Sequence, residues 1–132
     1  MREFKLDIVT PDGEEFSGNA ESLLVYTDDG VVEVLAGHVD YMASLGTGKA
    51  RVRFSDGERI ASASGGFLTV DRGEVTLVAT TFEWRDDIDV ERAKAAKENA
   101  EALIKDAKDE RAMAFAKAKL MRALNRLNVA EG

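Results

Sequence analysis

Short alternating segments separated by turn residues fill the first two thirds of the chain. The segment from Phe4 to Val9 alternates apolar and polar side chains until its end, and Pro11-Asp12-Gly13 follows it. Proline presets φ and glycine accepts a positive φ, so this triplet predicts a tight turn. Six further segments rich in β-branched residues are predicted as strands: 22–27, 31–35, 50–54, 59–63, 67–70 and 75–80. Short strands at this spacing indicate an antiparallel sandwich or a flattened barrel.

The pattern changes near residue 88. Ten of the eleven glycines lie at or before Gly73, and residues 88–127 contain neither glycine nor proline. Twelve alanines fall between Ala93 and Ala130, among many lysines, glutamates and arginines. These residue types favour helix, so residues 88–127 are predicted to be helical. Aspartates at positions 86, 87 and 89 lie where an N-cap and first turn would be.

The helical region has a narrow apolar stripe and one candidate break. The stripe follows helical spacing on one face: Met113, Ala116, Leu120, Ala123, Leu124 and Leu127. The polar stretch 105–110 could form a turn, with Asp109 capping a second helix, but no glycine or proline enforces it. A single helix over residues 88–127 would be about 60 Å long. Both a folded hairpin and an extended rod remain open, and so does a helical element that alternates between them.

Composition and charge agree with two parts, a sandwich over residues 1–85 and a helical region over residues 86–132. Residues 1–87 carry 8 basic and 17 acidic side chains, a net charge of −9, whereas residues 88–132 carry 10 and 8, a net of +2. The overall charge of −7 argues against general nucleic-acid binding. The absence of cysteine excludes disulfides and thiolate metal sites and fits a cytoplasmic protein.

Signs of catalysis are weak. His38 is the only histidine, which excludes a multi-histidine metal site. The stretch 46–50 superficially resembles a phosphate loop, but position 43 is alanine where that motif needs glycine, and position 50 is alanine where it needs serine or threonine. Gly65-Gly66 is too short for a dinucleotide fingerprint and predicts a bulge or tight turn. The chain is therefore not expected to be an enzyme.

Several motifs, in order along nearly the whole chain, resemble the epsilon subunits of bacterial F-type ATP synthases. They are Val9-Thr10-Pro11-Asp12-Gly13, Gly37-His38, Leu45-Gly46-Thr47-Gly48, Ser64-Gly65-Gly66-Phe67-Leu68-Thr69-Val70, Val75-Thr76-Leu77, Ile88-Asp89-Val90-Glu91-Arg92-Ala93 and Leu124-Asn125-Arg126-Leu127. One departure is Ala36, where many members have proline. The resemblance implies an α+β fold, in which an N-terminal antiparallel β-sandwich is followed by a C-terminal α-helical hairpin.

The resemblance also implies partners and a location. The sandwich would bind the gamma subunit and the membrane-embedded c-ring, with Gly37 and His38 as candidate rotor contacts. The helical region would fold against the sandwich, or extend toward the alpha and beta subunits and inhibit ATP hydrolysis. Lys117, Lys119, Arg122 and Arg126 would carry that inhibitory contact through complementary charge with an acidic loop of the beta subunit. The expected location is peripheral, on the cytoplasmic face of the bacterial plasma membrane.

A nucleotide motif is part of the same resemblance. Ile88-Asp89-x-x-Arg92-Ala93 matches the family's ATP-binding motif, and Glu83, Arg122 and Arg126 match further nucleotide-binding positions. Arginine suits phosphate because its planar fork donates parallel hydrogen bonds, whereas the Asp89 carboxylate suits the adenine amino group or the ribose hydroxyls. The alternative is that Asp89 merely begins the helix and pairs with Arg92, at little energetic gain.

The expected ligand is ATP as a regulator, with no required cofactor and no metal site in the protein. At position 99 this chain has asparagine where ATP-binding relatives carry arginine, which predicts weaker binding. A ligand that bridges both helices would favour the folded hairpin. The competing function is a free-standing nucleotide-binding β-sandwich module with a helical lid.

Overall fold

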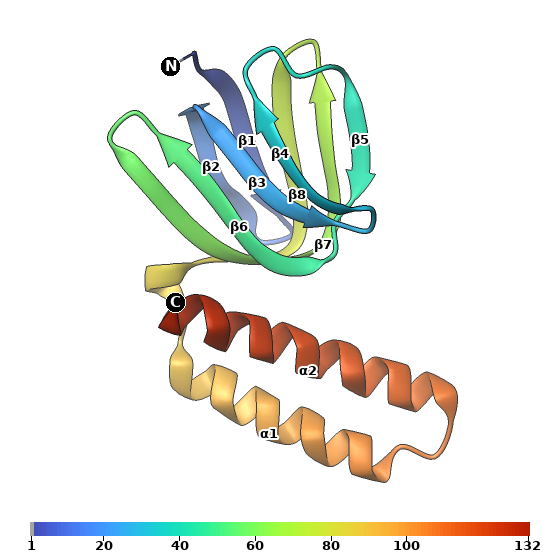
Figure 1. Cartoon of the computed structure of the whole chain (residues 1–132). Helices are drawn as coiled ribbons and strands as arrows, with labels where there is room; N and C mark the ends of the chain where they lie inside the picture. Colours follow the sequence, from blue (N-terminus) through green and yellow to red (C-terminus); the bar gives the residue numbers. More distant parts are fainter. Residues whose placement is uncertain (1) are drawn as a thin grey trace. The chain divides into compact units, whose positions relative to one another are not determined.

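The computed structural model describes residues 2–132, which form two compact units, one ending at Trp84 and the other spanning Arg85–Gly132 (Figure 1). The first unit is built from strands and the second from helices. Eight strands make up the first unit: β1 (Phe4–Thr10), β2 (Gly13–Ala20), β3 (Ser22–Thr27), β4 (Gly30–Leu35), β5 (Tyr41–Ser44), β6 (Thr47–Phe54), β7 (Gly57–Asp71) and β8 (Glu74–Trp84). The predicted β-sandwich followed by a helical hairpin is confirmed.

The strands follow the order β2-β1-β8-β7-β6-β3-β4, and β5 pairs with β7 off this path. One neighbouring pair departs from the antiparallel prediction, because β1 and β8 run parallel, with Leu6 opposite Val75 and Ile8 opposite Leu77. A parallel pair needs a long crossover, and here strands β2 to β7 supply it. The first and last strands of the unit are therefore hydrogen-bonded to each other.

A bend in the longest strand, β7, lets it serve two sets of neighbours. Its first half pairs with β6, its second half pairs with β5, and β8 pairs along both halves. Gly65 and Gly66 lie at the bend with φ of +73° and +91°, and a Cβ on Gly66 would lie 1.8 Å from the Val78 carbonyl oxygen. The predicted turn or bulge is therefore wrong: the pairing with β8 keeps one register through the two glycines.

Side chains from all the long strands fill the interior of the sandwich. The fully enclosed large residues include Leu6, Ile8, Leu23, Leu68 and Leu77. Each alternates with a polar or half-exposed neighbour, which is the period-two pattern of a strand with one buried face. This alternation explains why most of the sandwich could be predicted from the sequence.

An aromatic cluster closes one end of the core. The rings of Phe16 and Phe54, on β2 and β6, lie 5.3 Å apart, and Phe82 meets Trp84 edge-on at 4.9 Å. The Arg59 guanidinium lies 3.9 Å from the centre of the Trp84 ring. Trp84 is only 5% exposed, so the last residue of the sandwich is part of its core.

The second unit begins with a single 3₁₀ turn (Arg85–Asp87) and continues as two helices, α1 (Val90–Asp106) and α2 (Glu110–Glu131). Asp109 caps α2, because its side chain accepts a hydrogen bond from the Ala112 backbone N–H at 2.7 Å. The hairpin with a polar turn, one of the alternatives left open, is the form that the structure adopts. No helix among residues 2–132 is long and apolar enough to cross a membrane.

Candidate functional site

Asp89 has a defined structural role at the start of α1. It is the N-cap residue, and its Oδ1 accepts a hydrogen bond from the Arg92 backbone N–H at 3.1 Å. Within residues 2–132 no ion pair joins the Asp89 and Arg92 side chains. The expectation that Asp89 begins the helix is confirmed, but the pairing with the Arg92 side chain, which was part of the same interpretation, is not seen. The cap uses one of about four acceptor positions on the carboxylate.

The two helices contact each other through a seam of small residues. Ala93 and Ala100 on α1 are 2% and 1% exposed, and Ala116 and Ala123 on α2 are 1% and 0% exposed. The alanines are seven residues apart on each helix, which keeps them on one face, and Leu127 continues the α2 series four residues later. Ala93, predicted to be part of the nucleotide motif, is therefore a residue of this helix contact.

The predicted arginines lie beside this seam on one side of the hairpin. Arg92 directly precedes Ala93, Arg122 precedes Ala123, and Arg126 precedes Leu127. Each is therefore rotated by about 100° from its seam residue, in the same sense. Two antiparallel helices are related by a two-fold axis perpendicular to the plane that contains both helix axes. This rotation leaves each residue on its own side of the plane, so equivalent flanks of the two helices lie on the same side of the hairpin. Arg92, Arg122 and Arg126 consequently share one side, which we call the arginine flank.

Two further residues lie on the arginine flank by the same relation. Asn99 precedes Ala100, and Phe115 precedes Ala116, with its side chain 59% exposed. Position 99 is therefore on the same side of α1 as Arg92, seven residues further along the helix. The structure places the departure at Asn99 within the candidate site.

The predicted inhibitory lysines divide between the two flanks. Lys117 directly follows Ala116 and so lies on the flank opposite the arginines. Lys119 is three residues before Arg122 and seven before Arg126, which places it on the side of α2 that carries the arginines. Its Nζ lies 5.1 Å from the centre of the Phe115 ring. The four basic residues do not form a single face.

The remaining predicted nucleotide residues lie on both units. Glu83 is on β8, opposite Ser62 of β7, and so belongs to the sandwich. Ile88 lies between the 3₁₀ turn and α1, is 9% exposed, and donates its backbone N–H to the Arg85 carbonyl oxygen at 3.3 Å. An isoleucine side chain has no polar atom, so a polar contact between Ile88 and a ligand could come only from its backbone.

The loop between β4 and β5 contains the predicted rotor contacts, Gly37 and His38. Gly37 has a φ of +81°, and His38 Nδ1 lies 2.8 Å from the Val39 carbonyl oxygen. Because that oxygen can only accept, Nδ1 carries the proton of this hydrogen bond. Tyr41 meets the His38 ring edge-on at 5.7 Å. The loop is thus held by its own side chains.

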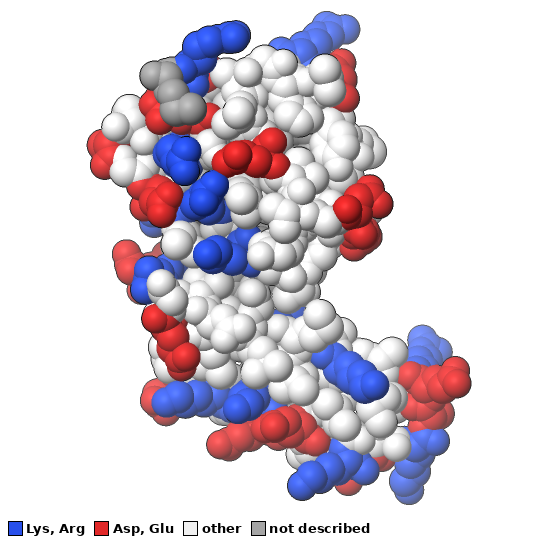
Figure 2. Space-filling view, viewed as in Figure 1, with Lys and Arg blue, Asp and Glu red and all other residues white. Residues whose placement is uncertain are grey.

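Large apolar side chains are exposed in this loop and along β3, β4, β5 and β7, and sequence reasoning missed them. They are Tyr26, Val31 and Leu35 on β3 and β4, Val39 in the loop, and Met42 and Phe67 on β5 and β7. Val39 and Met42 are 75% and 72% exposed. Figure 2 shows an uncharged area over β4 and β5 bordered by acidic side chains. The available signal was Val39 and Met42, which follow His38 closely and lie outside any predicted strand.

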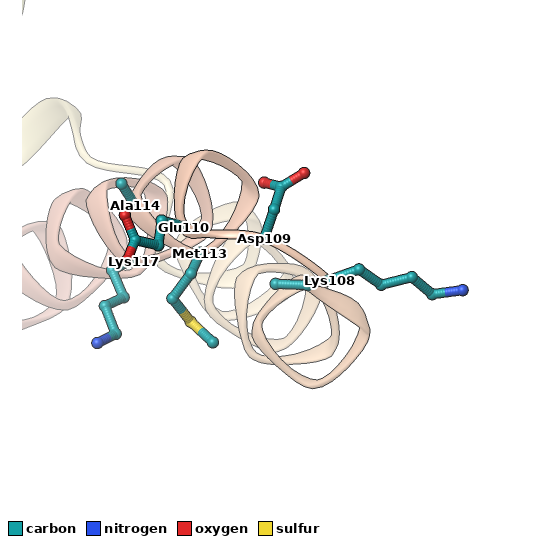
Figure 3. Close-up of a pocket in the computed structure, with 7 residues that line it drawn as sticks. Lys108, Asp109, Glu110, Met113, Ala114 and Lys117 are labelled. Carbon is teal, nitrogen blue, oxygen red and sulfur yellow. The ribbon is translucent and has the colours of Figure 1, made fainter.

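A hollow of about 540 Å³ lies beside the turn between the helices (Figure 3). Its lining is confined to the turn and the start of α2: Ala107, Lys108, Asp109, Glu110, Met113, Ala114 and Lys117. The Lys108 and Lys117 side chains extend in opposite directions, and Asp109 is engaged in the cap. The hollow contains none of the predicted nucleotide-binding residues. No cluster of three or more acidic, histidine or cysteine side chains that could hold a metal ion occurs within residues 2–132.

Solved structures with a similar fold come from two mitochondrial ATP synthases. A chain of the Euglena gracilis OSCP/F1/c-ring structure superposes with a TM-score of 0.82 at 24% identity, covering 98% of this chain and 82% of that one. A chain of the Tetrahymena thermophila central stalk/c-ring structure gives a TM-score of 0.73 at 15% identity, covering 98% and 97%. At these identities the likeness shows the fold.

Sequence comparisons show the family. The beta-sandwich domain model of the ATP synthase delta/epsilon chain matches residues 3–85, and the long alpha-helix domain model matches residues 86–131. The ATP synthase epsilon chain of Levilactobacillus brevis is 40% identical over 129 residues, covering 96% of this chain and 93% of the relative. That of Staphylococcus aureus is 39% identical over 132 residues, covering 99% and 98%. The chain therefore belongs to the epsilon-chain family of F-type ATP synthases, whose members are stalk subunits and not catalytic ones.

Proposed function

We propose that this chain joins the gamma subunit to the c-ring in the rotor of an ATP synthase, with its sandwich (residues 1–85) as the rotor-binding part. Family membership supports the assembly, and the Euglena and Tetrahymena structures with the same fold are described as complexes that contain a c-ring. The observation that carries the rotor contact is the exposed apolar surface around Gly37 and His38. The exposure of Val39 and Met42, which lie beside one loop, supports a surface that a partner would cover.

Co-purification with gamma and the c-ring tests this contact. We expect Val39→Asp combined with Met42→Asp to abolish co-purification, because two buried carboxylates without partners cannot be desolvated at low cost. Met121→Asp is the matched control, since Met121 is also an exposed methionine, 57% exposed, but lies on α2. Retention of gamma and the c-ring by the double variant would contradict the proposed surface. Failure of the wild type to co-purify with gamma would favour the free-standing nucleotide-binding module.

The helical region (residues 86–132) is proposed as a conformational inhibitor of ATP hydrolysis. In an extended state it would reach the alpha and beta subunits, with the basic side chains of α2 meeting an acidic loop of beta. We expect truncation after residue 87 to raise hydrolysis several-fold while coupled synthesis is kept. The two activities are to be compared in complexes that contain full-length or truncated chain. Equal hydrolysis under inhibiting conditions would refute the inhibitory role.

ATP is proposed as the ligand that favours the hairpin. The supporting observation is the arginine flank, because Arg92 comes from α1 and Arg122 and Arg126 come from α2. A polyphosphate held by both helices stabilises the state in which the helices are adjacent, by its differential affinity for that state. Asp89 is assigned to the base or ribose. Binding without turnover is expected, since no catalytic group is proposed.

Calorimetry on the isolated chain tests this ligand. Arg92→Ala and Arg126→Ala should each weaken ATP binding about tenfold or more, the scale of a lost charged hydrogen bond. Lys94→Ala is a matched control, because Lys94 directly follows Ala93 and lies on the opposite flank. Equal affinity in wild type and both arginine variants would refute the site.

The complete complex is expected at the cytoplasmic face of the bacterial plasma membrane.

A further inference from the structure

Lys119 has no assigned part in nucleotide binding, yet it lies where the flank lacks a cation. On α1, Asn99 is seven residues after Arg92, and on α2, Lys119 is seven residues before Arg126. Seven helical residues span about 10 Å, and the helices run in opposite directions. The step from Arg92 to Asn99 and the step from Arg126 to Lys119 therefore run the same way and have the same length.

The turn fixes the level of these pairs along the hairpin. Arg92 lies 14 residues before the last residue of α1, and Arg126 lies 16 residues after the first residue of α2. Asn99 lies 7 residues before the last residue of α1, and Lys119 lies 9 residues after the first residue of α2. Each pair is thus level to within about 3 Å along the helix axes. Lys119 lies across from Asn99, and Arg126 lies across from Arg92.

The side chain of Lys119 is placed to move toward a ligand. Its ammonium lies over the Phe115 ring at 5.1 Å, and that ring is 59% exposed. A cation at such an exposed ring is held weakly. Lysine also has a flexible four-carbon stem and three rotatable donors, so it can exchange the ring for a phosphate at little cost.

We propose that Lys119 binds the terminal phosphate of ATP and thereby sets the preference of this chain for ATP over ADP. The inference rests on the proposed ATP binding at the arginine flank. With the base near Asp89, the phosphates run along the flank away from the start of α1, past Arg92, Arg126 and Arg122. The terminal phosphate is the one nearest to the level of Lys119 and Asn99. Lys119 supplies there the positive charge that Asn99 does not.

Lys119→Met tests the proposal, because methionine keeps much of the apolar stem and removes the charge. Calorimetry with ATP and with ADP, each with and without magnesium, should show ATP affinity lowered about tenfold and ADP affinity changed less than about twofold. Lys117→Met is the matched control, two residues away and on the opposite flank, and it should leave both affinities unchanged. Circular dichroism of each variant verifies that the helices are kept.

A second variant gives an independent measurement. Asn99→Arg should restore the ATP affinity of Lys119→Met, and its gain should be smaller when Lys119 is present, because both cations would serve the same phosphate. Loss of ATP and ADP affinity to the same extent in Lys119→Met would overturn the role in selectivity. Unchanged ATP affinity in that variant would overturn the contact and leave the arginine site standing. Absence of ATP binding in the wild type would overturn both.

Discussion

The Asp40 carboxylate accepts a hydrogen bond from the backbone N–H of Arg72 at 2.9 Å. Arg72 has a φ of +51° in the turn between β7 and β8, the only positive φ of a non-glycine residue within residues 2–132. Asp40 lies in the loop with Gly37 and His38, 32 residues earlier in the chain. The hydrogen bond therefore ties the proposed rotor-binding loop to a turn that is held in an unfavourable backbone conformation.

This tie predicts opposite effects of two substitutions. Asp40→Ala should lower the free energy of unfolding by about 1 kcal/mol, the net value of a solvent-exposed hydrogen bond to a charged group. Arg72→Gly should raise it by about 0.5–1 kcal/mol, because glycine adopts positive φ without steric cost. Chemical denaturation measures both changes, and amide exchange at position 72 reports the bond itself. Unaltered protection of the Arg72 amide in Asp40→Ala would contradict the tie.

Gly66 and Gly73 separate the cost of backbone conformation from the cost of a steric clash. Both have positive φ, +91° and +80°, but a Cβ on Gly73 meets nothing within 4 Å, whereas one on Gly66 meets the Val78 backbone. Gly73→Ala should destabilise by about 1–2 kcal/mol. Gly66→Ala should cost about 3 kcal/mol or more, since β7 and β8 must separate locally. Thermal unfolding of the two variants provides the comparison, and equal melting temperatures would show that the strands yield easily.

Strand alternation and helix composition carried most of the fold prediction, and the failures have specific causes. β2 was not predicted because it contains only one large apolar residue, Phe16, among glutamates and glycines. It is an edge strand, whose solvent-facing acidic residues suit an edge but hide its period. β5 has four residues, too few to display an alternation. The parallel β1–β8 pair depends on a contact between distant segments, which no local pattern reveals.

The candidate site was predicted as a set of residues but not as an arrangement. The helical stripe included Leu124, which is 37% exposed, because an apolar residue beside Ala123 fits the same spacing within the width of the stripe. The most deeply buried members are instead Ala116 and Ala123, since small side chains let two helices approach closely, and Leu127 is buried with them. The separation of Lys117 from Lys119 follows from that seam, and it could be assigned only after the seam was known.

Substitution of Asp89 by asparagine and by alanine separates its role as the N-cap of α1 from its proposed role in nucleotide recognition. Asp89→Ala should destabilise the start of α1 by about 1 kcal/mol, whereas Asp89→Asn should keep the cap, because both residues accept from the N–H of position 92. If the carboxylate also reads the nucleotide, Asp89→Asn should lower ATP affinity about tenfold with unchanged helicity. Circular dichroism and calorimetry give the two quantities. Wild-type ATP affinity in Asp89→Asn would limit Asp89 to its role as a cap.

We expect the alanine seam to set how readily the hairpin opens. Buried alanines remove little apolar surface from water, so the helices are held together weakly, and enlargement of one alanine should separate them. Ala123→Leu places a larger side chain at a position that is 0% exposed, at a cost of about 1–3 kcal/mol to the closed hairpin. Ala118→Leu is the matched control, because Ala118 is exposed on the same helix.

Spin labels can report the distance between the helices, because the chain has no cysteine of its own. The labels are attached at Ala102→Cys and Ala114→Cys, two exposed positions that each lie four residues from the helix end at the turn. Ala123→Leu should lengthen the mean distance between the labels and broaden its distribution, and ATP should shorten the distance again. The ATP affinity of this variant should be lowered in proportion to the fraction of molecules whose hairpin is closed before ATP binds. Identical distance distributions in Ala123→Leu and Ala118→Leu would show that the seam does not control opening.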